Sequence, residues 1–163
     1  MKRHLLTTVL WTLLYSGAVK PCDCKPLASV TDELEESELV VSGKVINVTR
    51  KALSQTTAIV DSLGREFEVL LNPKIVNEYL IRLDRTYKGI SKSDTLILRT
   101  GIDPVTDCGL ILDLGRVYIF YCYYDISFMD RRDLALTYTT SICTRTRLFD
   151  KKEEKEILQT GSR

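Results

Sequence analysis

Two cysteines separated by a single residue, Cys22 and Cys24, follow an apolar leader, and they constrain the fold more than any other feature of the sequence. Cysteines this close together cannot both bond to one distant partner. We therefore expect them to join one extended segment to two remote parts of the chain. The leader reads as a signal peptide over residues 1–18, with a basic start, an apolar stretch and small residues at its end. Export of this kind favours disulfide formation.

The leader indicates a secreted protein of the extracellular space. The apolar stretch over residues 5–15 is shorter than the ~20 residues that a membrane helix needs, although an uncleaved anchor is the alternative interpretation. Cleavage after Ala18, or further on after Pro21, leaves a domain at residues 22–158 and a disordered tail at residues 159–163. The 23 basic and 22 acidic residues are dispersed along the 163 residues, which argues against nucleic acid as a partner.

The hydrophobic pattern predicts short strands framed by two small helices. Leu39, Val41, Gly43 and Val45 share one face of a first strand, and the glycine inside it suggests a bend or a bulge. Tyr79, Ile81, Leu83 and Tyr87 share one face of a later strand. Strands are expected at residues 38–49, 56–61, 65–71, 79–87, 94–99, 116–124 and 134–142, and helices at residues 29–37 and 150–158, with Asp32 and Asp150 as N-caps. The predicted fold is mainly β, a small closed five-stranded barrel of the OB type with two short flanking helices.

The residues that carry most enzyme chemistry are missing from the predicted mature chain. His4, the one histidine, lies in the signal peptide, and the acidic residues form no acid–base motif, so we expect no enzyme and no cofactor of the protein's own. A metal site built from the cysteines is disfavoured because a single Cys-x-Cys lacks the usual paired spacing. Asn47-Val48-Thr49 is a glycosylation sequon, and an unused sequon is the alternative.

Five short motifs, taken in order, carry a family resemblance. They are Cys22-Asp23-Cys24 with Pro26, Glu38-Leu39-Val40-Val41, Tyr87-Lys88-Gly89, the run from Asp94 through Pro104 to Cys108-Gly109, and Thr139-Thr140-Ser141-Ile142-Cys143. With this order and spacing, the chain resembles the N-terminal inhibitory domain of the tissue inhibitors of metalloproteinases, within the netrin-like module family. The similarity covers about residues 22–158.

The resemblance implies a pairing for four of the five cysteines. Cys22 would bond to Cys108 and Cys24 to Cys143. Cys122 matches nothing in the family pattern. We interpret it as a buried thiol on the strand at residues 116–124, with an intermolecular disulfide or a rearranged pairing as alternatives.

The resemblance also implies a function. The α-amine and carbonyl of Cys22 would bind the catalytic zinc of a secreted or membrane-tethered metalloprotease, and Asp23 would enter the specificity pocket of that protease. Cys24, Lys25 and Pro26 would complete an inhibitory ridge, with Thr106, Asp107 and Cys108 packed beside it. Extracellular matrix is a further expected partner. Two departures weaken this implication. Asp23 is charged, which indicates a narrow choice of target or a low affinity. Cleavage after Ala18 leaves three residues ahead of Cys22, so either further trimming occurs or the chain is a netrin-like binding module that does not touch zinc.

Overall fold

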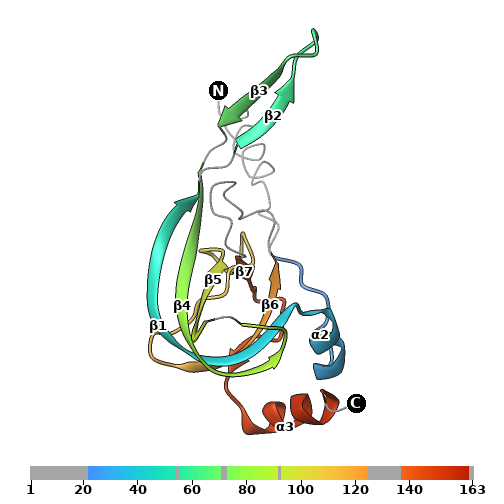
Figure 1. Cartoon of the computed structure of the whole chain (residues 1–163), viewed down its shortest axis with the longest axis vertical. Coiled ribbons are helices and arrows are strands. Elements are labelled where there is room, and N and C mark those ends of the chain that lie inside the picture. Colours follow the sequence, from blue (N-terminus) through green and yellow to red (C-terminus); the bar gives the residue numbers. More distant parts are fainter. Residues whose placement is uncertain (1–21, 54–55, 71–72, 92, 125–136, 162–163) are drawn as a thin grey trace, which may run out of the picture.

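Two long antiparallel strands, β1 (Leu39–Leu53) and β4 (Lys74–Lys88), run through the length of the computed structural model (Figure 1). The structure describes residues 22–53, 56–70, 73–91, 93–124 and 137–161. The predicted signal peptide lies outside the described residues, as do residues 134–136 of the last predicted strand. Both long strands extend beyond the predicted ranges at the end where they approach the β2–β3 hairpin.

Three more strands form a ring with this pair. Going around it, β4 pairs with β5, β5 with β7, β7 with β6, and β6 back with β1. The remaining elements of the described residues are the ring strands β5 (Thr95–Thr100), β6 (Val117–Tyr124) and β7 (Tyr138–Thr139), the short strand β8 (Arg147–Leu148) beside β6, the hairpin β2 (Thr56–Val60) and β3 (Glu66–Leu70), and the helices α2 (Val30–Glu36) and α3 (Lys151–Thr160). The part of the chain that the structure describes is therefore mainly β with two short helices, as predicted.

The inside of the ring is apolar. Side chains that alternate along each strand meet there, as period-two patterning requires. The buried members of this core are Leu39, Val41, Val45, Tyr79, Ile81, Leu96, Leu98, Leu112, Tyr118, Phe120, Cys122 and Tyr138. The predicted inward face of β1 is thus confirmed.

Bulges explain where simple alternation fails. Ser42 and Gly43 are adjacent on β1, but they pair with Arg85 and Leu83, so β4 carries an extra residue and its pattern reverses. Leu83 packs on the inner core, whereas Tyr87 packs on the opposite side, so the predicted shared face of these two residues is wrong. Gly43 sits at this bulge, and a Cβ there would lie 2.6 Å from the carbonyl oxygen of Arg82.

Both helices cover the outer face of the ring next to β6 (Figure 1). Val40, Ile119 and Tyr121 pack there against Val30, Leu34 and Ile157. This second core explains why β6 is apolar on both faces.

The helix boundaries differ slightly from the predicted ones. Ser29, not Asp32, caps α2, because its hydroxyl accepts the Asp32 N–H at 3.1 Å and Asp32 falls in the first turn. Asp150 caps α3 as predicted. The helix then continues through Gln159 and Thr160, which the prediction had placed in the tail.

The Tyr87-Lys88-Gly89 motif joins the ring to both helices. The Lys88 ammonium donates to the carbonyl oxygens of Leu34 and Glu35 at 2.8 and 2.7 Å, where the last carbonyls of α2 lack helical partners. Tyr87 donates to Glu154 of α3 at 2.8 Å. Gly89 has φ 81°, and a Cβ there would meet the Glu38 carbonyl, so the motif is structural.

The last predicted strand, at residues 134–142, is shorter in the described part of the structure because threonine hydroxyls take the place of backbone hydrogen bonds to β6. Only Tyr138–Thr139 pair as a strand among residues 137–142. Beyond them Thr140 donates to the Tyr121 carbonyl at 3.1 Å, and Thr146 accepts the Tyr121 N–H at 2.9 Å. Side-chain bonding of this kind competes with sheet pairing, which ends the strand early.

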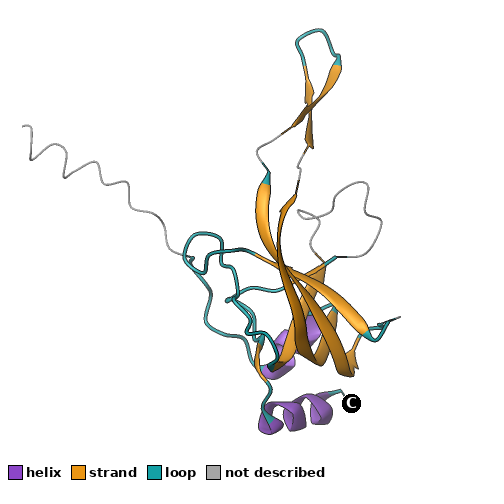
Figure 2. Cartoon of the chain, turned by 90° about the vertical axis from the view of Figure 1, so that its left-hand side faces the viewer, coloured by secondary structure: helices purple, strands orange, loops and turns teal. Residues whose placement is uncertain are grey.

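The β2–β3 hairpin projects away from the ring, and both views show it (Figures 1 and 2). Its turn is held by Asp61, whose carboxylate accepts the Leu63 and Arg65 N–H groups at 2.9 Å each. The paired Ile59 and Phe67 are about half exposed on one face. Among the described residues, no helix is long and apolar enough to cross a membrane.

Candidate functional site

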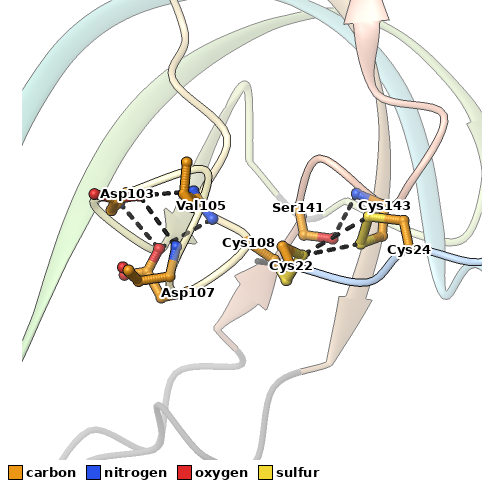
Figure 3. The surroundings of a disulfide bond; sticks show 10 residues. Cys22, Cys24, Asp103, Val105, Asp107, Cys108, Ser141 and Cys143 are labelled. Atoms are coloured by element: carbon orange, nitrogen blue, oxygen red, sulfur yellow. Dashed lines mark hydrogen bonds between the residues drawn. A yellow bond between two sulfur atoms is a disulfide. The ribbon is translucent and has the colours of Figure 1, made fainter. Parts of the chain in front are cut away.

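The extended segment before α2 is attached to two distant parts of the chain by disulfides (Figure 3). Cys22 is bonded to Cys108 with a Cα–Cα distance of 5.4 Å, and Cys24 to Cys143 with 5.1 Å. These are the pairs that the resemblance implies. The bridges span 86 and 119 residues. Closing loops this long restricts the unfolded chain, by ~4–5 kcal/mol each as an upper estimate in the chain-entropy model.

The two bridges lie against each other. Cys22 Sγ is 3.5 Å from Cys143 Sγ and 3.8 Å from Cys24 Sγ. The sulfurs of Cys22, Cys108 and Cys143 all lie within 4.8 Å of one another, a spacing compatible with a metal site. Each sulfur is already in a disulfide, however, and zinc needs the thiolate form. The sulfur cluster is therefore a pair of adjacent disulfides that fix residues 22–24 covalently, and not a metal site.

The backbone of Cys22 is also fixed. Its N–H donates to the carbonyl oxygen of Val105 at 2.8 Å. Val105 belongs to the loop over residues 101–108, which ends on the disulfide partner Cys108. Cys22 is thus held to this loop by a covalent bond and by a hydrogen bond, and the loop runs beside the segment (Figure 3).

The loop owes its shape to two aspartates. The Asp107 carboxylate accepts N–H groups from Ile102, Asp103 and Gly109 at 2.9, 2.9 and 3.0 Å. Asp103 accepts the N–H groups of Val105 and Thr106 at 2.6 and 3.1 Å. Together these bonds satisfy a run of backbone donors that no strand pairs, so the loop is ordered without regular structure.

Two glycines make room for the Asp107 side chain. A Cβ on Gly101 would overlap its carboxylate, and a Cβ on Gly109 would overlap the Gly101 backbone. Cys108 itself takes a positive φ of 54°, which turns the chain between Asp107 and Gly109. The carboxylate of Asp107 therefore stabilises its own loop, and the contact with a partner that the resemblance implies for this exposed residue stays a prediction.

The structure brings the expected site residues to one surface. Asp23, Lys25, Pro26 and Thr106 are exposed, and the cysteines beside them are half-buried. Sequence reasoning missed two residues that hold this surface in place, Val105 through its carbonyl and Arg145 through its guanidinium, which donates to the Ala28 carbonyl at 2.6 Å. A backbone carbonyl leaves no trace in a sequence pattern, and Arg145 lies in no motif.

Two further predicted positions lie away from this surface. Cys122 is fully buried on β6 and is the unpaired cysteine of the described residues. Burial raises the pKa of its thiol well above the ordinary range. Asn47 is exposed on β1, with its side-chain oxygen accepting the Val48 N–H at 2.9 Å. Its glycosylation stays a prediction.

No protein-family model and no curated protein sequence matches the chain. The case for a family therefore depends on the motifs and on the geometry of residues 22–28 and 101–108.

Proposed function

We propose that the chain is a secreted inhibitor of zinc metalloendopeptidases, similar to the N-terminal domain of the tissue inhibitors of metalloproteinases, and that its ring of strands is a closed OB-type barrel. One observation supports this most. Cys22 is held by the Cys22–Cys108 disulfide and by the Val105 carbonyl, while the adjoining Cys24 is held by Cys143. A ridge formed by residues 22–26 is thereby pre-organised, so little conformational entropy is lost on binding.

The chemistry of inhibition would come from the backbone of Cys22. A catalytic zinc site keeps one coordination position open for water or substrate. When Cys22 is the first residue, its neutral α-amine and its carbonyl oxygen are two ligands for that position, and they displace the water that attacks substrate. The hydrogen bond to Val105 leaves the lone pair of the amine for the metal, since an amine nitrogen donates through N–H and coordinates through its lone pair.

Asp23 would then face the specificity pocket of the protease. Its side chain is exposed in this structure. A carboxylate loses much of its hydration in an apolar pocket, so a target with a basic or hydrogen-bonding pocket is favoured. The pocket residue therefore narrows the range of target proteases.

A chemical modification of one amine tests the proposal. Folded protein that begins at Cys22 should inhibit a zinc endopeptidase, and carbamylation of its α-amine should abolish most of the inhibition. Near neutral pH the reagent prefers the α-amine, with a pKa of about 7.7–8.0, over lysines at about 10.4. Protein carbamylated after the complex has formed serves as the control, since its amine is then protected. Unchanged inhibition by the carbamylated protein would contradict the zinc contact.

A netrin-like binding module without protease inhibition is the second candidate. Val19-Lys20-Pro21 precede Cys22, and an amide nitrogen at Cys22 is a very poor ligand because its lone pair is delocalised. The first residue of the purified native protein discriminates the two: Cys22 supports the inhibitor, and Val19 supports the module.

A further inference from the structure

Arg145 links the amino-terminal segment to the end of the chain. It lies two residues after Cys143, and its Nη1 donates to the Ala28 carbonyl at 2.6 Å. Its Nε donates to Glu153 of α3 at 3.3 Å, and its backbone N–H donates to Glu33 of α2 at 3.3 Å. One residue therefore contacts the segment before α2 and both helices.

The two acidic partners of Arg145 are buried. Glu33 and Glu153 are each 4% exposed. Tyr123 donates to Glu33 at 2.7 Å, and Tyr121 donates to Glu153 at 2.9 Å, so both carboxylates are also bonded to β6. Buried carboxylates are stable only when paired and hydrogen-bonded. Glu33 therefore holds the backbone of Arg145, and Glu153 holds its guanidinium.

The contact at Ala28 matters because the ridge has few other non-covalent bonds. Within the described part of the chain, the backbone over residues 25–28, which precede the Ser29 cap of α2, has one hydrogen bond, from Arg145 to the Ala28 carbonyl. The disulfide at Cys24 holds one end of this stretch. The Arg145 guanidinium holds the other end.

We propose that Arg145 is a positioning residue for the ridge, and that α3 sets the position of the ridge through Glu153 and Arg145. The fork of the guanidinium is what makes this possible, because two nitrogens of one planar group reach Ala28 and Glu153 together. The consequence for inhibition rests on the proposed function. The consequence for the mobility of residues 24–28 does not.

Arg147 offers a matched control. Its Nε pairs with the same Glu153 at 3.0 Å and also donates to the Arg145 carbonyl at 3.4 Å, but its side chain does not bond to Ala28. Replacing either arginine removes one positive charge and one ion pair with Glu153. Only the replacement of Arg145 removes the bond to Ala28.

Backbone order parameters from NMR relaxation of the full folded chain test the positioning role. We would compare Arg145→Lys, Arg145→Met and Arg147→Met with the parent protein. In Arg145→Lys a cation stays near Glu153, but its single nitrogen cannot occupy the positions of both Nε and Nη1. In both Arg145 variants the order parameters of the amides of residues 24, 25, 27 and 28 should fall from about 0.85, the value of rigid backbone, to below about 0.6. Arg147→Met should leave them near the parent values.

Order parameters of residues 24–28 that stay near the parent values in both Arg145 variants would overturn the proposal. A fall that is equal in Arg145→Lys and Arg147→Met, or that is uniform over residues 24–28, β1 and β6, would overturn it too, since either result indicates general loosening. If Arg145→Met does not fold, the Lys variant carries the comparison. Inhibition by chains beginning at Cys22 is a separate measurement. If no form inhibits a zinc endopeptidase, the proposed function fails, while the order parameters still decide the role of Arg145.

Discussion

At the scale of single residues, Asp107 combines an exposed position with three backbone hydrogen bonds. Its two carboxylate oxygens accept N–H groups from Ile102, Asp103 and Gly109. Asp107→Asn replaces one of those oxygens with a donor that faces another donor. We expect a loss of about 1–3 kcal/mol in the free energy of unfolding, measured by urea denaturation with the disulfides intact.

Asp23→Asn is the control for this change, since it removes the same charge at an exposed position. A loss at Asp107 no larger than that of the control would mean that the loop does not depend on its carboxylate.

The burial of Cys122 predicts how the reactivity of its thiol depends on pH. An ordinary thiol has a pKa of about 8.5, and the thiolate is the reactive form. Burial raises the pKa of Cys122, so the folded protein keeps its thiol protonated where an exposed thiol ionises. Alkylation followed by mass spectrometry at pH 8.5 should leave Cys122 unmodified in the folded protein and label it fully in denaturant.

The raised pKa of Cys122 also makes the free energy of unfolding depend on pH. Above about pH 8.5 the unfolded chain loses the Cys122 proton and the folded chain keeps it. The contribution of this thiol to the free energy of unfolding is therefore complete below that pH and declines as the pH rises. Labelling of the folded protein at the rate of an unstructured peptide cysteine would contradict the buried position on β6.

At the scale of elements, the bulge that β4 forms against β1 depends on Gly43. A Cβ there would lie 2.6 Å from the Arg82 carbonyl and 2.8 Å from a methyl of Ile81, and neither atom can move freely. Gly43→Ala should lower the free energy of unfolding by about 1–3 kcal/mol, the usual cost of overpacking. Gly161→Ala is the matched control, because its Cβ would meet only an ordinary contact of 3.5 Å. Equal thermal stability of the two variants would show that β1 and β4 do not approach this closely.

The elements also show what a sequence can reveal. Local patterns were enough to place β1, β6, both described helices and the Asp150 cap of α3, since alternation and capping are set by neighbouring residues. The cap of α2 was predicted at Asp32, whereas Ser29 takes that position. The reversed face of Tyr87 and the two-residue β7 could not be predicted. They depend on an extra residue in β4 and on hydroxyls of Thr140 and Thr146 that bond across to β6, which are tertiary effects.

At the scale of the whole molecule, the amino-terminal segment is held by residues far from it in sequence. Cys108 and Cys143 matched a pattern and were expected. The Val105 carbonyl and the Arg145 guanidinium were not, because a backbone acceptor and an isolated arginine have no spacing that marks them. The motifs thus indicated which cysteines meet. The structure shows that Cys22 is held both by its disulfide and by a backbone hydrogen bond.

The most direct test of the account compares two folded, oxidised chains, one beginning at Cys22 and one at Val19, as inhibitors of the same zinc metalloendopeptidase. The Cys22 form has an α-amine for the metal, whereas the Val19 form has an amide nitrogen and three residues that would collide with the metal site. We predict inhibition by the first and loss of most of it in the second, with both disulfides and the thermal stability unchanged. Equal inhibition by the two chains would contradict the zinc contact at Cys22.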